Sequence, residues 1–118
     1  MKVVDSFWLA FGLLGLGLGS QLPTSIAEAS QTTATVATVL VWSSGNLVYV
    51  YPTVSITGVP ACGAAMPYYS FSYSRPMASA YLAALLSAQA RGSTITIYGT
   101  GTCTDQSISE TLDYFSIN

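Results

Sequence analysis

Hydrophobic and β-branched residues dominate two neighbouring segments of the chain, which is typical of β-strands. The first segment, Thr33 to Trp42, is rich in Val and Thr, and the turn residues Ser43 to Asn46 separate it from Leu47 to Thr57. The two segments therefore predict a β-hairpin. Pro52 predicts an edge position or a bulge, because proline cannot donate to the ladder. The second segment alternates two valines with larger side chains: Val48 and Val50 against Leu47, Tyr49 and Tyr51.

A third strand is predicted from Tyr68 to Tyr73, where aromatic and small polar residues alternate. Strand geometry places alternate residues on opposite faces. We expect three aromatic side chains on the core face: Tyr69, Phe71 and Tyr73. Tyr68 then lies on the opposite, serine-bearing face. Thr94 to Tyr98 alternates again and predicts a fourth strand, followed by a turn-rich loop over Gly99 to Cys103 that lacks the third glycine and the lysine of nucleotide-binding loops.

Residues 75 to 91 have the spacing of a helix. Ser74 is a favourable N-cap, Pro76 suits the first turn, Arg91 lies in the last turn, and Gly92 follows as a C-terminal stop. One side is predicted to face the core: Met77, Ala78, Tyr81, Leu82, Leu85 and Ala88. The other side is small and uncharged: Ser79, Ala80, Ala83, Ser87 and Ala90. This second side indicates either self-association or an exposed alanine-rich helix, since alanine needs no partner to be helical.

The C-terminal segment has two interpretations. Ser107 and Glu110 fit a capping box at the start of a helix, whereas a final strand from about Thr111 to Ile117 completes the order β-β-β-α-β-β. We favour the strand. That order is the order of the OB-fold, a small five-stranded, partly open barrel with one helix between its third and fourth strands. A generic α+β roll is the competing assignment.

An apolar run from Phe7 to Gly19 has the length found in secretory signal peptides. It is shorter than the roughly 17 to 25 residues that span a bilayer. Ala27-Glu28-Ala29 supplies the small residues of a cleavage site, so we expect residues 1–29 to be a cleaved signal peptide and residues 30–118 to form a single OB-like domain. The alternative is an uncleaved anchor or a buried strand. The leader predicts a secreted or periplasmic protein without a stable membrane span.

The chain is poor in ionisable side chains: 7% of its residues are charged, and histidine is absent. Histidine is the commonest general base and metal ligand. Three Lys or Arg residues in the whole chain do not neutralise a run of phosphates, so the sequence excludes nucleic acid as a partner. Glu110 and Asp113 form the one candidate carboxylate pair of a glycosidase, which we interpret instead as a solvated edge. We expect a non-enzymatic protein with no catalytic residue, no metal and no cofactor.

Cys62 and Cys103 are the two cysteines of the chain. An even number of cysteines in an exported chain predicts a disulfide, and two cysteines allow one pairing. Closing a loop of this length would stabilise the fold by roughly 4 kcal/mol. A reactive thiol pair is less favoured, because no Lys or His lies beside either cysteine to lower a thiol pKa.

These features together resemble the B subunits of bacterial AB-type toxins, in particular the subtilase-cytotoxin and typhoid-toxin group. The resemblance rests on a cysteine ahead of the Ala- and Leu-rich helix, the Gly92 stop, the strand Ile95-Thr96-Ile97-Tyr98 and the second cysteine. It implies an OB-fold, a homo-oligomeric ring of five subunits and binding of a host-cell glycan. Carried onto this chain, the implied sugar-binding positions are Thr33 or Thr35 in the first strand, Tyr98, and the loop at Thr100.

Glycans are bound by aromatic faces together with uncharged hydrogen-bonding groups. Three aromatic residues outside the predicted core are therefore further candidates: Trp42 beside the first turn, Tyr68 on the serine-bearing face, and Tyr98 before the glycine loop. The alternative function is that of a periplasmic or surface structural protein that pairs through a sheet edge and binds no small molecule.

Overall fold

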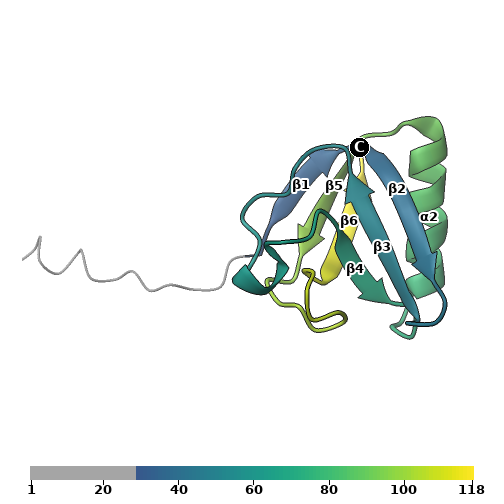
Figure 1. The fold of residues 1–118 in the computed structure, drawn as a ribbon. Coiled ribbons are helices and arrows are strands. Elements are labelled where there is room, and N and C mark those ends of the chain that lie inside the picture. Colours follow the sequence, from purple (N-terminus) through teal and green to yellow (C-terminus); the bar gives the residue numbers. More distant parts are fainter. Residues whose placement is uncertain (1–28) are drawn as a thin grey trace, which may run out of the picture.

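The computed structural model describes residues 29–118, so the predicted leader lies outside the described residues except for Ala29 (Figure 1). Strands dominate this part of the chain, and one α-helix lies between β4 and β5. In chain order the elements are β1 (Gln31–Ala34), β2 (Val36–Trp42), β3 (Leu47–Pro52), the 3-10 turn η1 (Ala61–Gly63), β4 (Tyr69–Ser72), α2 (Ala78–Arg91), β5 (Ile95–Gly99) and β6 (Leu112–Ile117). The predicted small β-rich fold with one helix is confirmed for residues 29–118.

The strands form two antiparallel three-stranded sheets, in the orders β1-β5-β6 and β2-β3-β4. One parallel bridge, between Ser70 of β4 and Thr111, links the two sheets. Beside it, the Ser70 amide donates to the Glu110 carbonyl at 3.1 Å. Within residues 29–118 the pairing does not close into a barrel, so the described arrangement is two sheets with one covering helix.

The long first strand that the sequence predicts is divided at Thr35. Residues before Thr35 pair with β5 and residues after it pair with β3, so the chain passes from one sheet to the other here. The Thr35 carbonyl accepts the Thr53 amide at 3.1 Å. The register shifts between Val36 and Thr38, opposite Pro52. The irregularity expected from Pro52 is therefore confirmed, and it marks the change of sheet.

Strand β3 buries both of its faces. Val48 and Val50 share one face, as their alternation predicts, and this face is fully buried on the helix side. The main core also contains Tyr69, Phe71, Leu85, Ile95, Ile97 and Leu112. The opposite face forms a second cluster from Leu47, Tyr49 and Tyr68, with Tyr51 and Met66 packed on it.

Tyr73 does not join the core. It was expected beside Tyr69 and Phe71, but β4 ends at Ser72 and the Tyr73 side chain is 42% exposed. The Tyr73 amide donates to the Asn46 carbonyl at 2.9 Å, which continues the β3–β4 register one step beyond Leu47 and Ser72. Tyr73 therefore lies at the end of the sheet, beside the β2–β3 turn, where the core no longer covers it.

The start of α2 differs from the prediction. The helix begins at Ala78 after Met77, whose backbone is left-handed with φ of 70°. Ser74 does not cap it, because the Ser74 Oγ accepts the side-chain amide of Asn46 at 2.6 Å instead. The expected places of Ser74 as N-cap and of Pro76 in the first turn are therefore wrong, and Met77 is exposed rather than part of the core stripe.

The end of α2 follows the prediction. Gly92 has φ of 66°, and its amide donates to the carbonyls of Ala88 and Gln89. Leu85 and Ala88 are fully buried, so the helix packs on the sheets by the predicted stripe. The small, uncharged side is exposed along its length: Ser79, Ala80, Ala83, Ser87 and Ala90.

The C-terminal segment is the strand β6, so the helix suggested by the Ser107–Glu110 capping box is wrong. Strand β6 pairs with β5 over Ile95 to Gly99. The Cys62–Cys103 disulfide is confirmed, with 6.3 Å between the two Cα atoms. It joins η1 to the loop between β5 and β6.

No helix in residues 29–118 combines the length and the apolar character needed to cross a membrane. The same residues contain no group of three or more Cys, Asp or Glu side chains placed to hold a metal ion.

Candidate functional site

Four aromatic side chains line the outer side of the sheet β2-β3-β4, and we call them the aromatic face: Trp42, Tyr49, Tyr51 and Tyr68. Tyr49 and Tyr68 are stacked with 4.3 Å between their ring centroids. Tyr51 lies 5.1 Å from Tyr68, and Trp42 lies 6.2 Å from Tyr49. The two stacked tyrosines are buried, whereas Trp42 is 44% exposed at the end of β2. The face therefore presents an indole to solvent on a rigid base of tyrosines.

A side-chain amide from the β5–β6 loop fixes this base. The Gln106 Oε1 atom accepts hydrogen bonds from the hydroxyl groups of Tyr68 and Ser109, both at 2.8 Å. The Gln106 Nε2 atom donates to the Tyr49 hydroxyl. Its neighbour Asp105 accepts the Ser72 amide through Oδ2 at 2.7 Å, which ties the loop to the end of β4.

The hydroxyl of Tyr68 stays protonated over a wide pH range. Burial is the main cause that raises the pKa of Tyr68, and the nearby Tyr49 raises it further. A phenol with a raised pKa remains a neutral hydrogen-bond donor at physiological pH. The aromatic face accordingly combines aromatic surface with neutral hydroxyl and amide groups.

Gly45 in the turn permits the position of the indole. A Cβ atom at residue 45 would lie 2.6 Å from the Trp42 ring. The Trp42 side chain thus covers the turn that follows its own strand, and a larger residue at position 45 would displace it.

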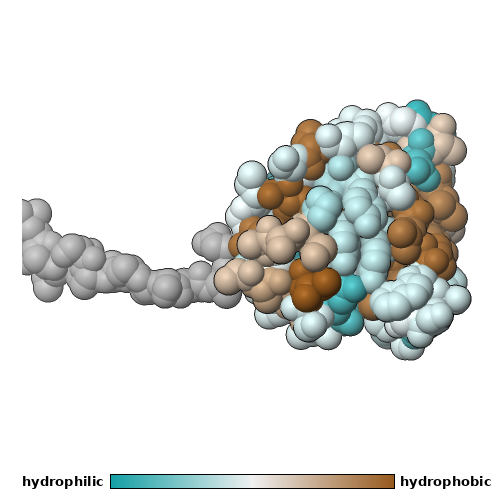
Figure 2. Space-filling view, viewed as in Figure 1, coloured by the Kyte–Doolittle hydropathy of each residue, from teal (hydrophilic) through white to brown (hydrophobic). Residues whose placement is uncertain are grey.

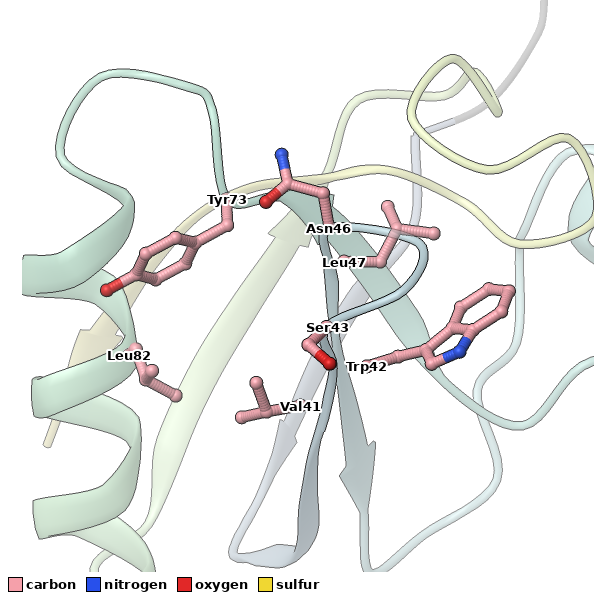
Figure 3. A pocket seen from close by; sticks show the side chains of 7 residues that line it. All are labelled: Val41, Trp42, Ser43, Asn46, Leu47, Tyr73 and Leu82. Atoms are coloured by element: carbon pink, nitrogen blue, oxygen red, sulfur yellow. The ribbon is translucent and has the colours of Figure 1, made fainter.

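A separate pocket of about 350 Å³ lies between the same turn and α2, and we call it the turn pocket. Figure 3 shows Val41, Tyr73 and Leu82 pointing into this space, while the indole of Trp42 points to the other side of the hairpin. The complete lining is Val41, Trp42, Ser43, Asn46, Leu47, Tyr73 and Leu82. Its apolar character suits an apolar side chain better than a sugar.

The residues predicted for sugar binding lie in two separate groups. Trp42 and Tyr68 belong to the aromatic face. Thr33 and Tyr98 lie on the other sheet, where Thr33 bonds to Thr96 and Tyr98 stacks on Tyr114 with 4.4 Å between the centroids.

Two further predicted positions make only local contacts. Thr35 bonds to Thr53 through their hydroxyl groups, at the point where the first strand divides. Thr100 bonds to Thr102 within the β5–β6 loop. The bonding partners of both, Thr53 and Thr102, are exposed residues outside the strands.

Sequence reasoning missed three members of this site: Tyr49, Gln106 and Asp105. The signal for Tyr49 was present, because it alternates with two buried valines and precedes Tyr51 by two residues on the same face. No local pattern marks Gln106 or Asp105, since a loop brings them to the sheet from more than thirty residues along the chain.

The carboxylate pair suggested by the sequence does not form one site. Glu110 is 1% exposed, whereas Asp113 lies exposed on β6. The interpretation of both as a solvated edge is wrong for Glu110, because loop glycines and Ser30 enclose its carboxylate. The two side chains therefore cannot cooperate as an acid and a base on one substrate.

No protein-family model, no curated protein and no solved structure matches this chain.

Proposed function

We propose that this chain is an exported, non-enzymatic glycan-binding module that assembles as a ring of identical subunits, in the manner of the toxin B subunits that its sequence resembles. The observation that carries the proposal is the exposed Trp42 indole at the end of a face that carries uncharged amide and hydroxyl groups and, at the far side of the same sheet end, the Asp105 carboxylate.

The order of the strands supports an OB-like arrangement. Strands β1 and β2 together correspond to the long first strand of that fold, and the parallel bridge between Ser70 and Thr111 lies between the third and the last of its strands. OB-folds bind oligosaccharides on the face of strands two and three and with the loops beside them. Here that face is the outer side of β3 and β4, which carries the aromatic face.

A sugar on this face would contact groups on neighbouring strands. Trp42 pairs with Leu47 across the hairpin, and Leu47 pairs with Ser72, whose amide is held by Asp105. Neighbouring strands lie about 4.8 Å apart, so the indole and the Asp105 carboxylate lie at opposite sides of the same sheet end. An aromatic plane for C–H groups and a carboxylate for hydroxyl groups are the two contacts that sugar recognition needs.

Replacing Trp42 with alanine is expected to weaken glycan binding at least tenfold, about 1.4 kcal/mol, because it removes the exposed stacking surface. Trp42→Phe should retain most of the affinity, since it keeps an aromatic plane. The measurement is titration against the best hit of a glycan array screened with the oxidised protein lacking its leader.

Tyr98→Ala serves as the competing arm of the same titration. If Tyr98→Ala weakens binding and Trp42→Ala does not, the sugar lies on the sheet β1-β5-β6, as the resemblance implies, and not on the aromatic face. Denaturation curves of both variants, with midpoints close to that of the unaltered protein, would show that the losses are local.

Assembly into a ring is supported by exposed apolar side chains at two sheet edges. In the described sheets β2 and β6 are edge strands, and each carries exposed apolar side chains. These are Leu40 and Val41 on β2, and Tyr114 and Ile117 on β6. Figure 2 shows apolar surface gathered where β2 and α2 lie side by side. Side chains already bind backbone carbonyls at these edges, from Arg75 and Tyr81 on β6 and from Gln89 on β2. The exposed apolar side chains, rather than free backbone groups, would therefore contact another chain, and joining two different edges head to tail generates closed rings.

Val41→Asp is expected to convert the assembly to monomers, because it places a charge at the β2 edge and in the turn pocket. Val54→Asp is the matched control, since Val41 is 57% exposed and Val54 is 49% exposed but lies on the loop after β3. Native mass spectrometry of the oxidised protein checks both. A monomeric mass for the unaltered protein contradicts ring assembly.

The second candidate is a structural or interaction protein without a small ligand, and the same apolar edges favour it. A ring mass together with the absence of any glycan hit supports this candidate over the lectin-like one.

A further inference from the structure

Glu110 is a buried carboxyl group that the proposed glycan site does not use. It is 1% exposed, and both of its oxygens accept hydrogen bonds. The Ser30 Oγ donates to Oε1 at 2.6 Å, while the backbone amides of Ser30 and Gly101 donate to Oε2 at 3.1 and 2.8 Å. Three donors, one hydroxyl and two backbone amides, therefore surround the two oxygens of Glu110.

Two glycines shape the cradle around this carboxylate. A Cβ atom at Gly99 would overlap the Glu110 carboxylate itself. Gly101 has φ of 83°, a conformation that suits glycine, and it thereby aims its amide at Oε2. The glycine loop that fails as a nucleotide-binding loop thus encloses a carboxylate of its own chain.

A line of hydroxyl groups ends at the same carboxylate. The Ser30 hydroxyl donates its one hydrogen bond to Glu110. The Tyr69 hydroxyl, 2.6 Å from the Ser30 Oγ, must therefore be the donor in the bond between these two groups. Thr32 then donates to Tyr69 at 2.7 Å. Burial raises the pKa of Tyr69, and the negative Glu110 contributes to the same direction. The donors of this line of hydroxyl groups are therefore directed toward the Glu110 carboxyl group.

None of the donors to this carboxylate is a cation. The described residues contain two basic side chains, Arg75 and Arg91. Arg75 donates to the carbonyls of Leu112 and Asp113, and Arg91 ends α2. Burying a carboxylate without a cation is costly, because hydrogen bonds replace only part of its hydration. The site lacks one positive charge.

Ser30 is placed to supply that charge. Its nitrogen is already bonded to Oε2, and its carbonyl accepts the Gly99 amide at 3.0 Å, so the residue is anchored on both sides. Ser30 is buried, whereas Ala29 immediately before it is exposed. The bond between them is the one that the small-residue pattern marks for leader removal.

We propose that Glu110 is the binding site for the α-ammonium group that a signal peptidase creates by hydrolysing the Ala29–Ser30 peptide bond. Water adds to the Ala29 carbonyl, the C–N bond breaks, Ala29 leaves as a carboxylate, and the Ser30 amine takes up a proton. The neutral amide that now donates to Glu110 becomes a cation at the same place. This inference rests on the proposed export of the chain.

The consequence is a fold that leader removal stabilises. Before cleavage Glu110 is buried with neutral donors alone, and after cleavage it has an ion pair in a water-poor site, where charges interact strongly. The precursor is accordingly the less stable form, which suits a chain that must cross a membrane before it folds.

The composition provides a specific test. The single lysine of the chain is Lys2, in the leader, so a protein that begins at Ser30 has one amine, its own α-amino group. Acetylation of that amine removes the charge and retains an N–H group. We expect acetylation to lower the folding equilibrium constant of the exported protein at least tenfold, measured by urea denaturation. A change below twofold overturns the proposal.

Glu110→Gln is the matched variant, since an amide fills the cradle without a charge. In this variant acetylation should change the folding constant less than twofold, and an undiminished effect would assign the stabilisation to something other than the ion pair. Should Glu110→Gln fail to fold, the labelling rate of the unaltered protein with a succinimidyl ester tests the ion pair instead. The Ser30 amine should react at least tenfold more slowly in the folded protein than in the protein unfolded by urea. Equal rates would contradict the pairing of this amine with Glu110.

The intact mass of the exported protein separates this inference from the proposed function. A chain that begins at a residue other than Ser30 overturns the inference and leaves glycan binding untouched. A chain that begins at Ser30 and responds to acetylation supports it even when every glycan assay is negative.

Discussion

The double variant Cys62→Ala/Cys103→Ala should lose about 4 kcal/mol of unfolding free energy. The disulfide joins residues 41 positions apart, so it removes a large loop-closure entropy from the unfolded chain. Cys62 is exposed and Cys103 is half-buried, and their replacement by alanine therefore costs little packing in the folded state. Equilibrium urea denaturation of the oxidised protein and of the double variant measures the difference.

Two outcomes test the physical reason. The slope of the free energy with urea should rise in the variant, because its unfolded state exposes more surface, and reduction of the unaltered protein should reproduce the lost stability. An unchanged midpoint would contradict the claim that this small fold depends on the bridge.

The bridge also bears on the site around Glu110. Gly63 follows Cys62, and a Cβ atom at Gly63 would lie 2.8 Å from the Glu110 backbone nitrogen. The disulfide thus holds η1 tightly against the loop that carries Glu110. Loss of the bridge should loosen the cradle before it affects the distant end of the sheet, where Trp42 lies.

Features encoded by neighbouring residues were predictable from the sequence. The two faces of β3 follow from alternation, because successive residues of a strand point to opposite faces: Val48 and Val50 join the main core, and Leu47 and Tyr49 join the second cluster. The end of α2 follows from Gly92 alone, since a glycine adopts the left-handed conformation that closes a helix without strain.

Features decided by distant contacts were not predictable. The expected cap of α2 is lost to Asn46, whose side-chain amide binds the Ser74 hydroxyl from 28 residues earlier in the chain. The burial of Glu110 depends on Ser30, eighty residues earlier in the chain. No periodic pattern in the neighbouring residues indicates either contact. Because a charged residue is normally exposed, the local sequence around Glu110 predicts that it lies on the surface.

The candidate site also contains residues that the sequence predicted and residues that only the structure identifies. Trp42 and Tyr68 could be selected from the sequence because each is an aromatic residue beside a turn or on a polar face. That Trp42 and Tyr68 belong to one surface follows only from the pairing of β2, β3 and β4, which places Tyr49 between these two side chains. The loop residue Gln106 could be assigned only after the sheet was known.

Leu85→Ala should destabilise the fold by about 3 kcal/mol, the second large effect that we expect. Leu85 is fully buried where α2 meets the sheets, so truncation removes apolar contacts and leaves a cavity, which costs about 2 to 5 kcal/mol for a leucine. Because α2 is the element that covers β2 and the inner valines, its loss of packing should lower the urea midpoint of the whole fold rather than unfold one end.

Leu86→Ala is the matched control, because the two leucines are adjacent, lie in the middle of the same helix and differ in burial. Leu86 is 45% exposed against 0% for Leu85, and alanine is the better helix former, so the monomer should lose less than about 1 kcal/mol. Equal losses in both variants would contradict the packing of α2 by its predicted stripe. A change in oligomeric mass for Leu86→Ala alone, with little loss of monomer stability, would place the exposed side of α2 in the contact between subunits.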